Sequence, residues 1–199
     1  MSETGKALFC ERLNLPMKKL DIATGDAAVL RKVAEPVSKI DLPLQTLIDE
    51  MIFTMRDATG VGLAAPQINR SIRLVVIETP PEHDDDGEVI PDSRDLYVMI
   101  NPKITNASRK VNNGVEGCLS LPGYVGEVSR SQAIMVEFLD RRGKKQRLRL
   151  KGWDARIVQH EVDHLDGIMY TDKLTDPDHF WTDEEYEKML EEAAESGEE

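Results

Sequence analysis

The sequence predicts an α+β fold with antiparallel or mixed β-sheet, and three observations lead to this prediction. Apolar residues recur at helical spacing over 43–58, where they form one stripe. Several runs rich in β-branched and apolar residues follow between 72 and 151. A second helical pattern comes late, over 153–165. Strands followed by a late helix are typical of the α+β class.

The N-terminal part of the chain predicts mainly helix. Residues 1–20 show no clear period and are expected to form a loose lead-in, and a short helix is expected over 26–34. The helix over 43–58 begins near Asp41 and Pro43, since an acid followed by proline is common at a helix start. Its stripe consists of Leu44, Leu47, Ile48, Met51, Ile52 and Met55.

The middle of the chain predicts strands, which we expect over 72–78, 96–101, 103–108, 124–129, 133–139 and 145–151. The last two pair across a turn that contains Gly143. The polar stretch at 79–95 is interpreted as an inserted surface loop, and a final helix rich in glutamate is expected near 182–194. Because no repeat or linker divides the chain, residues 1–199 are expected to form a single domain.

The charge distribution is uneven. The net charge is −12, and residues 183–199, an acidic helix and tail, carry nine acids and one base. Such a tail argues against nucleic-acid binding, and we expect no DNA partner. Residues 141–151 carry seven bases and no acids. A run of this kind is usually the solvated face of a hairpin, and the alternative is contact with RNA, for instance on a ribosome.

Membrane insertion and export are not expected. No eighteen consecutive residues are apolar, so the sequence predicts no membrane-spanning segment. The first twenty residues lack the apolar run of a secretory signal, and they contain Glu3 and Glu11, which organelle transit peptides tend to avoid. We therefore expect a cytoplasmic protein, in which Cys10 and Cys118 stay unpaired in a reducing compartment.

The strongest chemical pattern is the run from His160 through Glu161 to His164. Residues four apart on a helix lie on one face, so both imidazoles can bind one ion, and Glu161 can reach a water beside it. A catalytic ion of this kind usually takes three protein ligands and one water. The pattern therefore predicts a hydrolytic metal site that needs a third ligand from elsewhere in the chain.

The third ligand has several candidates. The longer spacing that ends in a third histidine is excluded, because Tyr170 stands at that position. A downstream glutamate, Glu184 or Glu185, is one alternative, and His179 is another. Cys118 is the better candidate, because a thiolate near a cation ligates strongly and a preceding glycine lets the backbone come close. The competing interpretation of Cys118 is a buried structural cysteine.

A third segment, 60–67, consists largely of glycine and alanine and ends in Gln67. Small residues let an extended segment lie against other backbone or against a ligand. The Gln67 amide could donate a hydrogen bond to a developing oxyanion. The alternative is a tightly packed connection between a helix and a strand.

Together the three segments resemble the signature motifs of the peptide deformylase family, in the same order: GVGLAAPQ at 60–67, EGCLS at 116–120 and QHEVDHLDG at 159–167. The similarity extends from about Asp26 to Leu174. The resemblance implies an α+β fold in which sheets surround the helix that carries the two histidines.

The resemblance also implies roles for individual residues. It implies that Cys118, His160 and His164 bind one divalent ion, with water as the fourth ligand. Glu161 would be the general acid and base, while Gln67 and the backbone N–H of Leu119 would form the oxyanion site. Residues expected to contact substrate are Val61, Gly62, Glu116, Gly117, Trp153 and Ile157. Within this set Val61, Trp153 and Ile157 would line the methionine pocket, Gly62 would lie beside the substrate backbone, and Glu116 would also pair with Arg130.

The implied reaction is hydrolysis of the N-formyl group from formyl-methionyl peptides, with release of formate. The implied ion in the cell is Fe²⁺, for which Zn²⁺ or Ni²⁺ can substitute. Two other interpretations are retained. One is a zinc endopeptidase that uses Glu184 or Glu185 as third ligand and is indifferent to loss of Cys118. The other is a non-catalytic module with a closed site of four protein ligands.

Overall fold

The computed structural model describes residues 17–81, 84, 87–90 and 93–196. Residues 1–16 of the expected lead-in over 1–20 therefore lie outside the described residues. Parts of the expected loop over 79–95 and the last three residues of the acidic tail also lie outside them. Within the described ranges, no helix is both long enough and apolar enough to cross a lipid bilayer.

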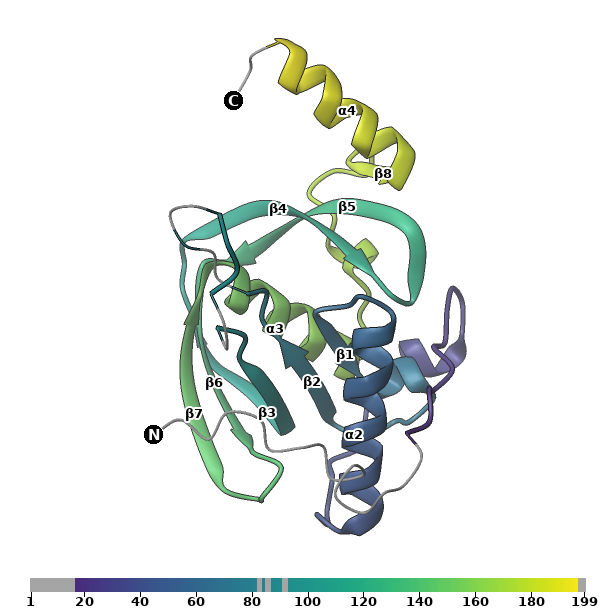
Figure 1. Ribbon diagram of the computed structural model, residues 1–199, viewed down its shortest axis with the longest axis vertical. Helices are drawn as coiled ribbons and strands as arrows, with labels where there is room; N and C mark the ends of the chain where they lie inside the picture. Colours follow the sequence, from purple (N-terminus) through teal and green to yellow (C-terminus); the bar gives the residue numbers. More distant parts are fainter. Residues whose placement is uncertain (1–16, 82–83, 85–86, 91–92, 197–199) are drawn as a thin grey trace.

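The predicted α+β class is confirmed (Figure 1). The α-helices of the described chain are α2 (Leu42–Asp57), α3 (Gly152–Leu165) and α4 (Asp183–Ser196), and its short 3-10 helices are η1 (Ala28–Arg31), η2 (Ala65–Ile68) and η3 (Tyr170–Lys173). Its strands are β1 (Gly62–Ala64), β2 (Leu74–Glu78), β3 (Leu96–Ala107), β4 (Val111–Cys118), β5 (Leu121–Ser131), β6 (Ala133–Leu139), β7 (Lys145–Lys151) and β8 (Phe180–Thr182).

The strands form two antiparallel sheets. The larger sheet has the order β1-β2-β3-β6-β7, and the smaller has the order β4-β5-β8. The expected hairpin between β6 and β7 is present. Its turn uses Gly143 at φ 79°, and the Asp140 carboxylate accepts hydrogen bonds from the Arg142 and Lys144 backbone N–H groups, both at 2.9 Å.

Helix α2 begins where the sequence predicts. The Asp41 side chain accepts a hydrogen bond from the Leu44 backbone N–H at 3.2 Å, which satisfies one of the free donors of the first turn. Pro43 lies in that same turn, where it gives up no helical hydrogen bond.

The larger sheet lies between α2 and α3. The side chains of β2 alternate between the two faces of the sheet, so this one strand packs against both helices. Val75 and Ile77 belong to the apolar cluster that includes Val158 and Leu165 of α3. Leu74 and Val76 belong to the cluster that includes Ile48 and Ile52 of α2. Helix α3 also contacts β5 of the smaller sheet, so it lies between strands of both sheets, as Figure 1 shows.

Several elements differ from the sequence predictions. The helix expected over 26–34 is the four-residue η1. The strands expected over 96–101 and 103–108 form one long strand, β3, which is bulged after Ile100 and again after Ile104. Strands β1, β4 and β8 were not predicted. Segment β4 contains two asparagines and two glycines, which are rare in strands, and it is held in place by pairing along the length of β5.

Replacing Ile52 in α2 by alanine tests the packing of this layer. Ile52 is fully buried, so Ile52→Ala should lower the free energy of unfolding by about 2–5 kcal/mol through lost burial and a residual cavity. Leu42→Ala in the same helix is the matched control, because Leu42 is 55% exposed and should cost less than about 1 kcal/mol. Urea unfolding followed by circular dichroism measures both. Equal costs would contradict this description of the core.

Candidate metal centre

The site is built from three segments that are far apart in the sequence. Gln67 lies in η2, directly after the short strand β1. Cys118 is the last residue of β4, where the pairing with β5 shifts register. His160, Glu161 and His164 lie in the second half of α3, on the part of the helix that faces the sheets. The two sheets and the helix must therefore all be in place before these side chains meet.

The side chains of Cys118, His160 and His164 form a compact group, with one ligand atom from each within 4.8 Å of the others. The Cys118 Sγ lies 3.2 Å from the His164 Nε2, which in turn lies 3.2 Å from the His160 Nε2. Helical spacing explains why the two imidazoles converge, since residues four apart lie on the same face. The sequence prediction that a mid-chain sulfur meets these two rings therefore agrees with the structure.

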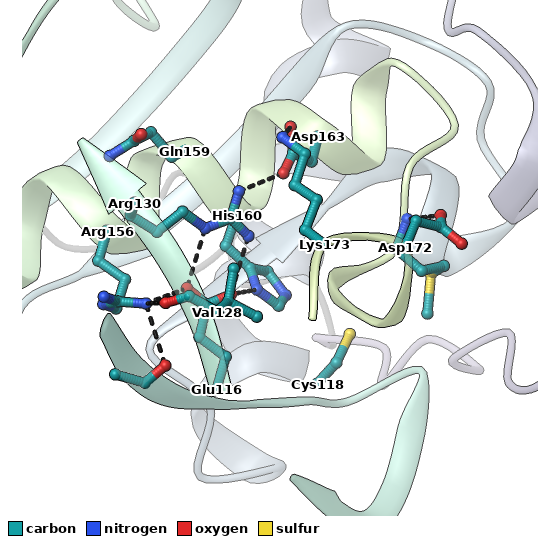
Figure 2. Close-up of polar contacts among 12 residues, drawn as sticks. Glu116, Cys118, Val128, Arg130, Arg156, Gln159, His160, Asp163, Asp172 and Lys173 are labelled. Carbon is teal, nitrogen blue, oxygen red and sulfur yellow. Dashed lines mark hydrogen bonds and ion pairs between the residues drawn. The ribbon is translucent and has the colours of Figure 1, made fainter. Parts of the chain in front are cut away.

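A buried carboxylate, Glu116, fixes the first of these imidazoles. Its Oε2 lies 2.9 Å from the His160 Nδ1, so the ring presents its Nε2 to the cluster. The same carboxylate forms ion pairs with Arg130 at 2.8 Å and with Arg156 at 2.7 Å. The ion pair expected between Glu116 and Arg130 is therefore present. All three charged side chains are less than 5% exposed, so these contacts form a buried network (Figure 2).

The network continues from Arg130 to a second carboxylate on α3. Arg130 donates to Asp163, whose other oxygen accepts from Lys173 of η3 at 2.7 Å. Arg156 also donates to the carbonyl oxygens of Val128 at 2.9 Å and Asn112 at 2.8 Å. Figure 2 shows the resulting chain of contacts across β4, β5 and α3. The contacts hold the smaller sheet against the helix that carries the histidines.

The electrostatics of the site follow from these contacts. Burial opposes ionisation of Glu116, but hydrogen bonds from Arg130 and His160 outweigh it and lower the pKa of this carboxyl to about 2. Burial also opposes a charge on His160, yet contacts with Cys118 and Glu116 raise its pKa to about 10. Burial and the charge of His160 lower the pKa of His164 well below its ordinary value. The two neighbouring imidazoles therefore shift in opposite directions, with the pKa of His160 raised and that of His164 lowered.

Glu161 lies beside the cluster and is 4% exposed. Its Oε2 has no hydrogen-bond partner among the described residues. Burial raises the pKa of Glu161 to about 7, which is near the range in which a side chain can both accept and return a proton. Gly62 lies against it, because a β-carbon added at Gly62 would come within 2.3 Å of the Glu161 Oε1. Only glycine allows β1 to approach the carboxylate this closely.

Gln67 is held with its amide group directed at the cysteine segment. Its Oε1 accepts a hydrogen bond from the Ala64 N–H at 2.8 Å. Its Nε2 lies 3.2 Å from the Ser120 Oγ and 3.5 Å from the Cys118 Sγ. The carbonyl end is occupied by backbone, and the amide nitrogen donates to Ser120 and Cys118, so the Gln67 amide borders the sulfur of the cluster.

A cavity of about 460 Å³ opens beside the cluster. Its lining includes every residue that the sequence analysis expected to contact substrate and the residues expected to form the oxyanion site, namely Val61, Gly62, Gln67, Glu116, Gly117, Leu119, Trp153 and Ile157. Cys118, His160 and Glu161 also contribute to the lining. Of these lining residues, Trp153 is 50% exposed, whereas Ile157 is buried. The three sequence segments thus converge on one concave site.

The alternative third ligands lie elsewhere. His179 is 46% exposed and places its Nδ1 3.0 Å from Glu127. Glu185 accepts hydrogen bonds from the Thr182 backbone N–H at 2.8 Å and from its hydroxyl group at 3.0 Å, which caps the start of α4. Among the described residues, neither of these nor Glu184 belongs to the group that could hold an ion with the two histidines. This arrangement disfavours the endopeptidase interpretation.

The donor set fits a divalent ion. Sulfur and imidazole nitrogen are the ligand atoms that iron, nickel and zinc share. The lowered pKa of His164 favours the neutral ring that ligation needs, and the hydrogen bond that the His160 Nδ1 donates to Glu116 is the kind of outer contact that orients a ligating ring. Cys118 and His160 also line the cavity, so the group that could hold an ion borders a space large enough for a ligand.

Three charged residues of the network were missed by the sequence analysis, namely Arg156, Asp163 and Lys173. Arg156 precedes His160 by one helical turn on α3, so helical spacing alone could have indicated that it faces the site. Asp163 lies within the histidine motif, but its partner Arg130 is on β5, and no sequence pattern connects the two.

Comparison with known proteins agrees with this geometry. The sequence profile described as Polypeptide deformylase matches residues 19–180. A peptide deformylase from Symbiobacterium thermophilum is 50% identical over 159 residues, covering 80% of this chain and 68% of the relative. A peptide deformylase from Thermodesulfovibrio yellowstonii is 43% identical over 159 residues, covering 80% of this chain and 91% of the relative.

Solved structures give the same result. The peptide deformylase of Thermotoga maritima has a TM-score of 0.71 and 35% identity, over 80% of this chain and 99% of that one. A class I type b peptide deformylase from Acinetobacter baumannii with bound Met-Ala-Ser has a TM-score of 0.71 and 34% identity, over 80% of this chain and all of that one.

Replacing Glu116 by glutamine tests its role as support for His160. Glu116→Gln should weaken metal affinity by roughly 10–100-fold, because the neutral amide is a weaker acceptor for the ring and removes the ion pair of the buried Arg156. Glu127→Gln is the control, since Glu127 also contacts a histidine Nδ1 but lies outside the cluster. Competition with a chromophoric chelator measures both affinities. Unchanged affinity in Glu116→Gln would show that His160 does not need this support.

Proposed function

The chain belongs to the polypeptide deformylase family of metal-dependent hydrolases, and on this basis we propose how its residues remove the formyl group from formyl-methionyl peptides. Cys118, His160 and His164 hold one divalent ion, and Glu161 moves the proton. The observation that carries the proposal is the meeting of one sulfur and two imidazoles beside a buried glutamate in the wall of a cavity.

Glu161 acts as general base and then as general acid. When bound, the ion would polarise the formyl carbonyl and lower the pKa of the water to roughly 7. Glu161 takes the proton of the attacking water and later returns it to the amine that leaves. Its buried position and its raised pKa of about 7 support this role, because a carboxylate that is a stronger base accepts the proton more readily.

Gln67 and Leu119 stabilise the oxygen that gains charge as the carbonyl becomes tetrahedral. The Gln67 Nε2 and the Leu119 backbone N–H donate hydrogen bonds to it, and each such donor contributes roughly 3 kcal/mol to the transition state. The position of Gln67 supports this assignment, because its carbonyl end is fixed by the Ala64 N–H, its amide nitrogen lies 3.5 Å from the Cys118 Sγ, and the residue lines the cavity.

The cavity binds the formyl-methionine. Val61, Trp153 and Ile157 hold its side chain, and Gly62 and Gly117 lie against the peptide backbone. Glu116 belongs to the same lining, but its carboxylate already serves Arg130, Arg156 and His160. We therefore assign Glu116 a positioning role through His160.

The ion that we propose for the cell is Fe²⁺, with Zn²⁺ or Ni²⁺ able to substitute. A thiolate with two imidazoles suits all three ions. Formate release by protein reconstituted with each ion in turn, with iron kept anaerobic, distinguishes them. Higher turnover with zinc than with iron would contradict the choice of iron.

We also propose that the enzyme works in the cytoplasm and contacts the ribosome through residues 141–151. Within strand β7 the bases at 145, 147, 149 and 151 are all exposed, so they form one positive stripe. Replacing Arg147 and Arg149 by glutamine should reduce cosedimentation with ribosomes at low salt. Unchanged cosedimentation would exclude this contact.

Replacing Glu161 by glutamine tests the chemistry. Glu161→Gln should retain the metal but lose roughly 10²–10⁴-fold in turnover, because the amide cannot take up a proton. Formate release from formyl-Met-Ala-Ser measures the turnover, and metal analysis of the same samples provides the control. Retained turnover at full metal occupancy would refute the assignment.

Replacing Cys118 by alanine tests the ligand set. Cys118→Ala should sharply lower metal content, because two imidazoles alone bind a divalent ion weakly. His179→Ala is the control, since this histidine is exposed and lies outside the cluster. The endopeptidase alternative predicts full metal content and cleavage of internal peptide bonds in the Cys118 variant. Such a result would move the third ligand elsewhere.

A further inference from the structure

One residue of the cavity comes from outside the part of the chain that matches the family. Asp183 lines the cavity that contains Glu161, although the family match ends at residue 180. It is the first residue of α4, the acidic helix that extends beyond the β4–β5 hairpin in Figure 1. The C-terminal helix α4 therefore adds a carboxylate to the wall of the cavity.

Strand β8 holds Asp183 in this position. Thr182, the preceding residue, pairs with Tyr124 of β5, and the rings of Tyr124 and Phe180 are stacked with centroids 5.3 Å apart. The Thr182 hydroxyl and the Glu185 carboxylate complete the cap of α4. Because Glu185 serves this cap, the carboxylate of Asp183 is not needed for it.

Asp183 differs in exposure from the other charged residues of the cavity. Glu116, Arg156 and Glu161 are each 4% exposed, and the first two form an ion pair. Asp183 is exposed, and within the described part of the chain its carboxylate has no ion pair. The accessible charge of the cavity wall is therefore negative.

Tyr124 adds an aromatic surface next to this charge. It lines the same cavity and is 41% exposed, and its backbone pairs with the residue directly before Asp183. A lysine or arginine side chain can lay its aliphatic stem on an aromatic ring while its charged end reaches a carboxylate. An acidic side chain placed there would instead be repelled.

We propose that Asp183, together with Tyr124, determines specificity by favouring peptides in which a lysine or arginine follows the formyl-methionine within two residues. The proposal rests on the proposed function, because it concerns residues of the peptide beyond the methionine. The effect falls mainly on KM, since the contact is remote from the reacting carbonyl and is made equally in the ground and transition states.

The test compares kcat/KM for two matched pairs of peptides, formyl-Met-Lys-Ala with formyl-Met-Glu-Ala and formyl-Met-Ala-Lys with formyl-Met-Ala-Glu. The wild type should favour lysine over glutamate by about two- to fivefold in at least one pair at low salt, as expected for a partly exposed charge contact. Asp183→Asn should bring that ratio close to one, and Asp183→Lys should invert it. Each ratio is taken within one variant, so a general loss of activity cancels.

Glu187→Gln is the matched control, because Glu187 is an exposed acid of the same helix that does not line the cavity. It should keep the wild-type ratio. The proposal is overturned if the wild type shows no preference, if Asp183→Asn retains it, or if Glu187→Gln reduces it as much as Asp183→Asn does. The last outcome would assign the preference to the summed negative charge of α4 and not to Asp183.

Binding of the product peptides separates this inference from the proposed function. Calorimetry with Met-Ala-Lys, Met-Ala-Glu, Met-Lys-Ala and Met-Glu-Ala gives the same ratios without any reaction. If no formyl peptide is hydrolysed but the lysine peptides bind more tightly in an Asp183-dependent way, the proposed function fails and the assignment of Asp183 stands. If hydrolysis is normal but lysine and glutamate peptides bind equally well, the assignment of Asp183 fails and the proposed function stands.

Discussion

The buried carboxylate of Glu116 is the constraint on which the site and much of the surrounding fold depend. An isolated charge in the interior is very unfavourable, so Glu116 can be buried only where Arg130, Arg156 and His160 surround it. These partners lie on β5 and α3, while Glu116 itself lies on β4. One ionic network therefore requires the smaller sheet and the central helix to meet in a single arrangement.

The same network also fixes the positions of the side chains in the candidate metal centre. Glu116 is two residues from Cys118, so fixing one positions the other, and its contact with Nδ1 sets the orientation of His160. On the opposite side, Gly62 brings β1 against Glu161. Cys118, the two imidazoles and Glu161 are thus positioned by three elements, β4, α3 and β1, and such fixed geometry is the preorganisation that metal-assisted hydrolysis uses.

The sequence predicted those features whose information is local. The helix bearing His160 and His164, and the cap at Asp41, follow from spacing and residue type within a few positions. Strand β4 could not be predicted this way, because its asparagines and glycines oppose strand formation and only pairing with β5 stabilises it. Thiolate chemistry made Cys118 the better candidate for a third ligand, but only the resemblance implied that it joins the histidines, since no local pattern relates positions more than forty residues apart. Asp183 was assigned only to an acidic tail, because its place in the cavity depends on the pairing of β8.

Strand β8 has one more consequence. It hydrogen-bonds to β5 over Tyr124, Val125 and Gly126, at the side of the hairpin that borders the cavity. Without it, this stretch would be an edge strand whose free backbone groups could pair with any extended chain. An enzyme that meets unfolded, newly made polypeptides is especially exposed to such mispairing. Because β8 covers this edge, an extended chain cannot pair with the β5 backbone at the border of the cavity.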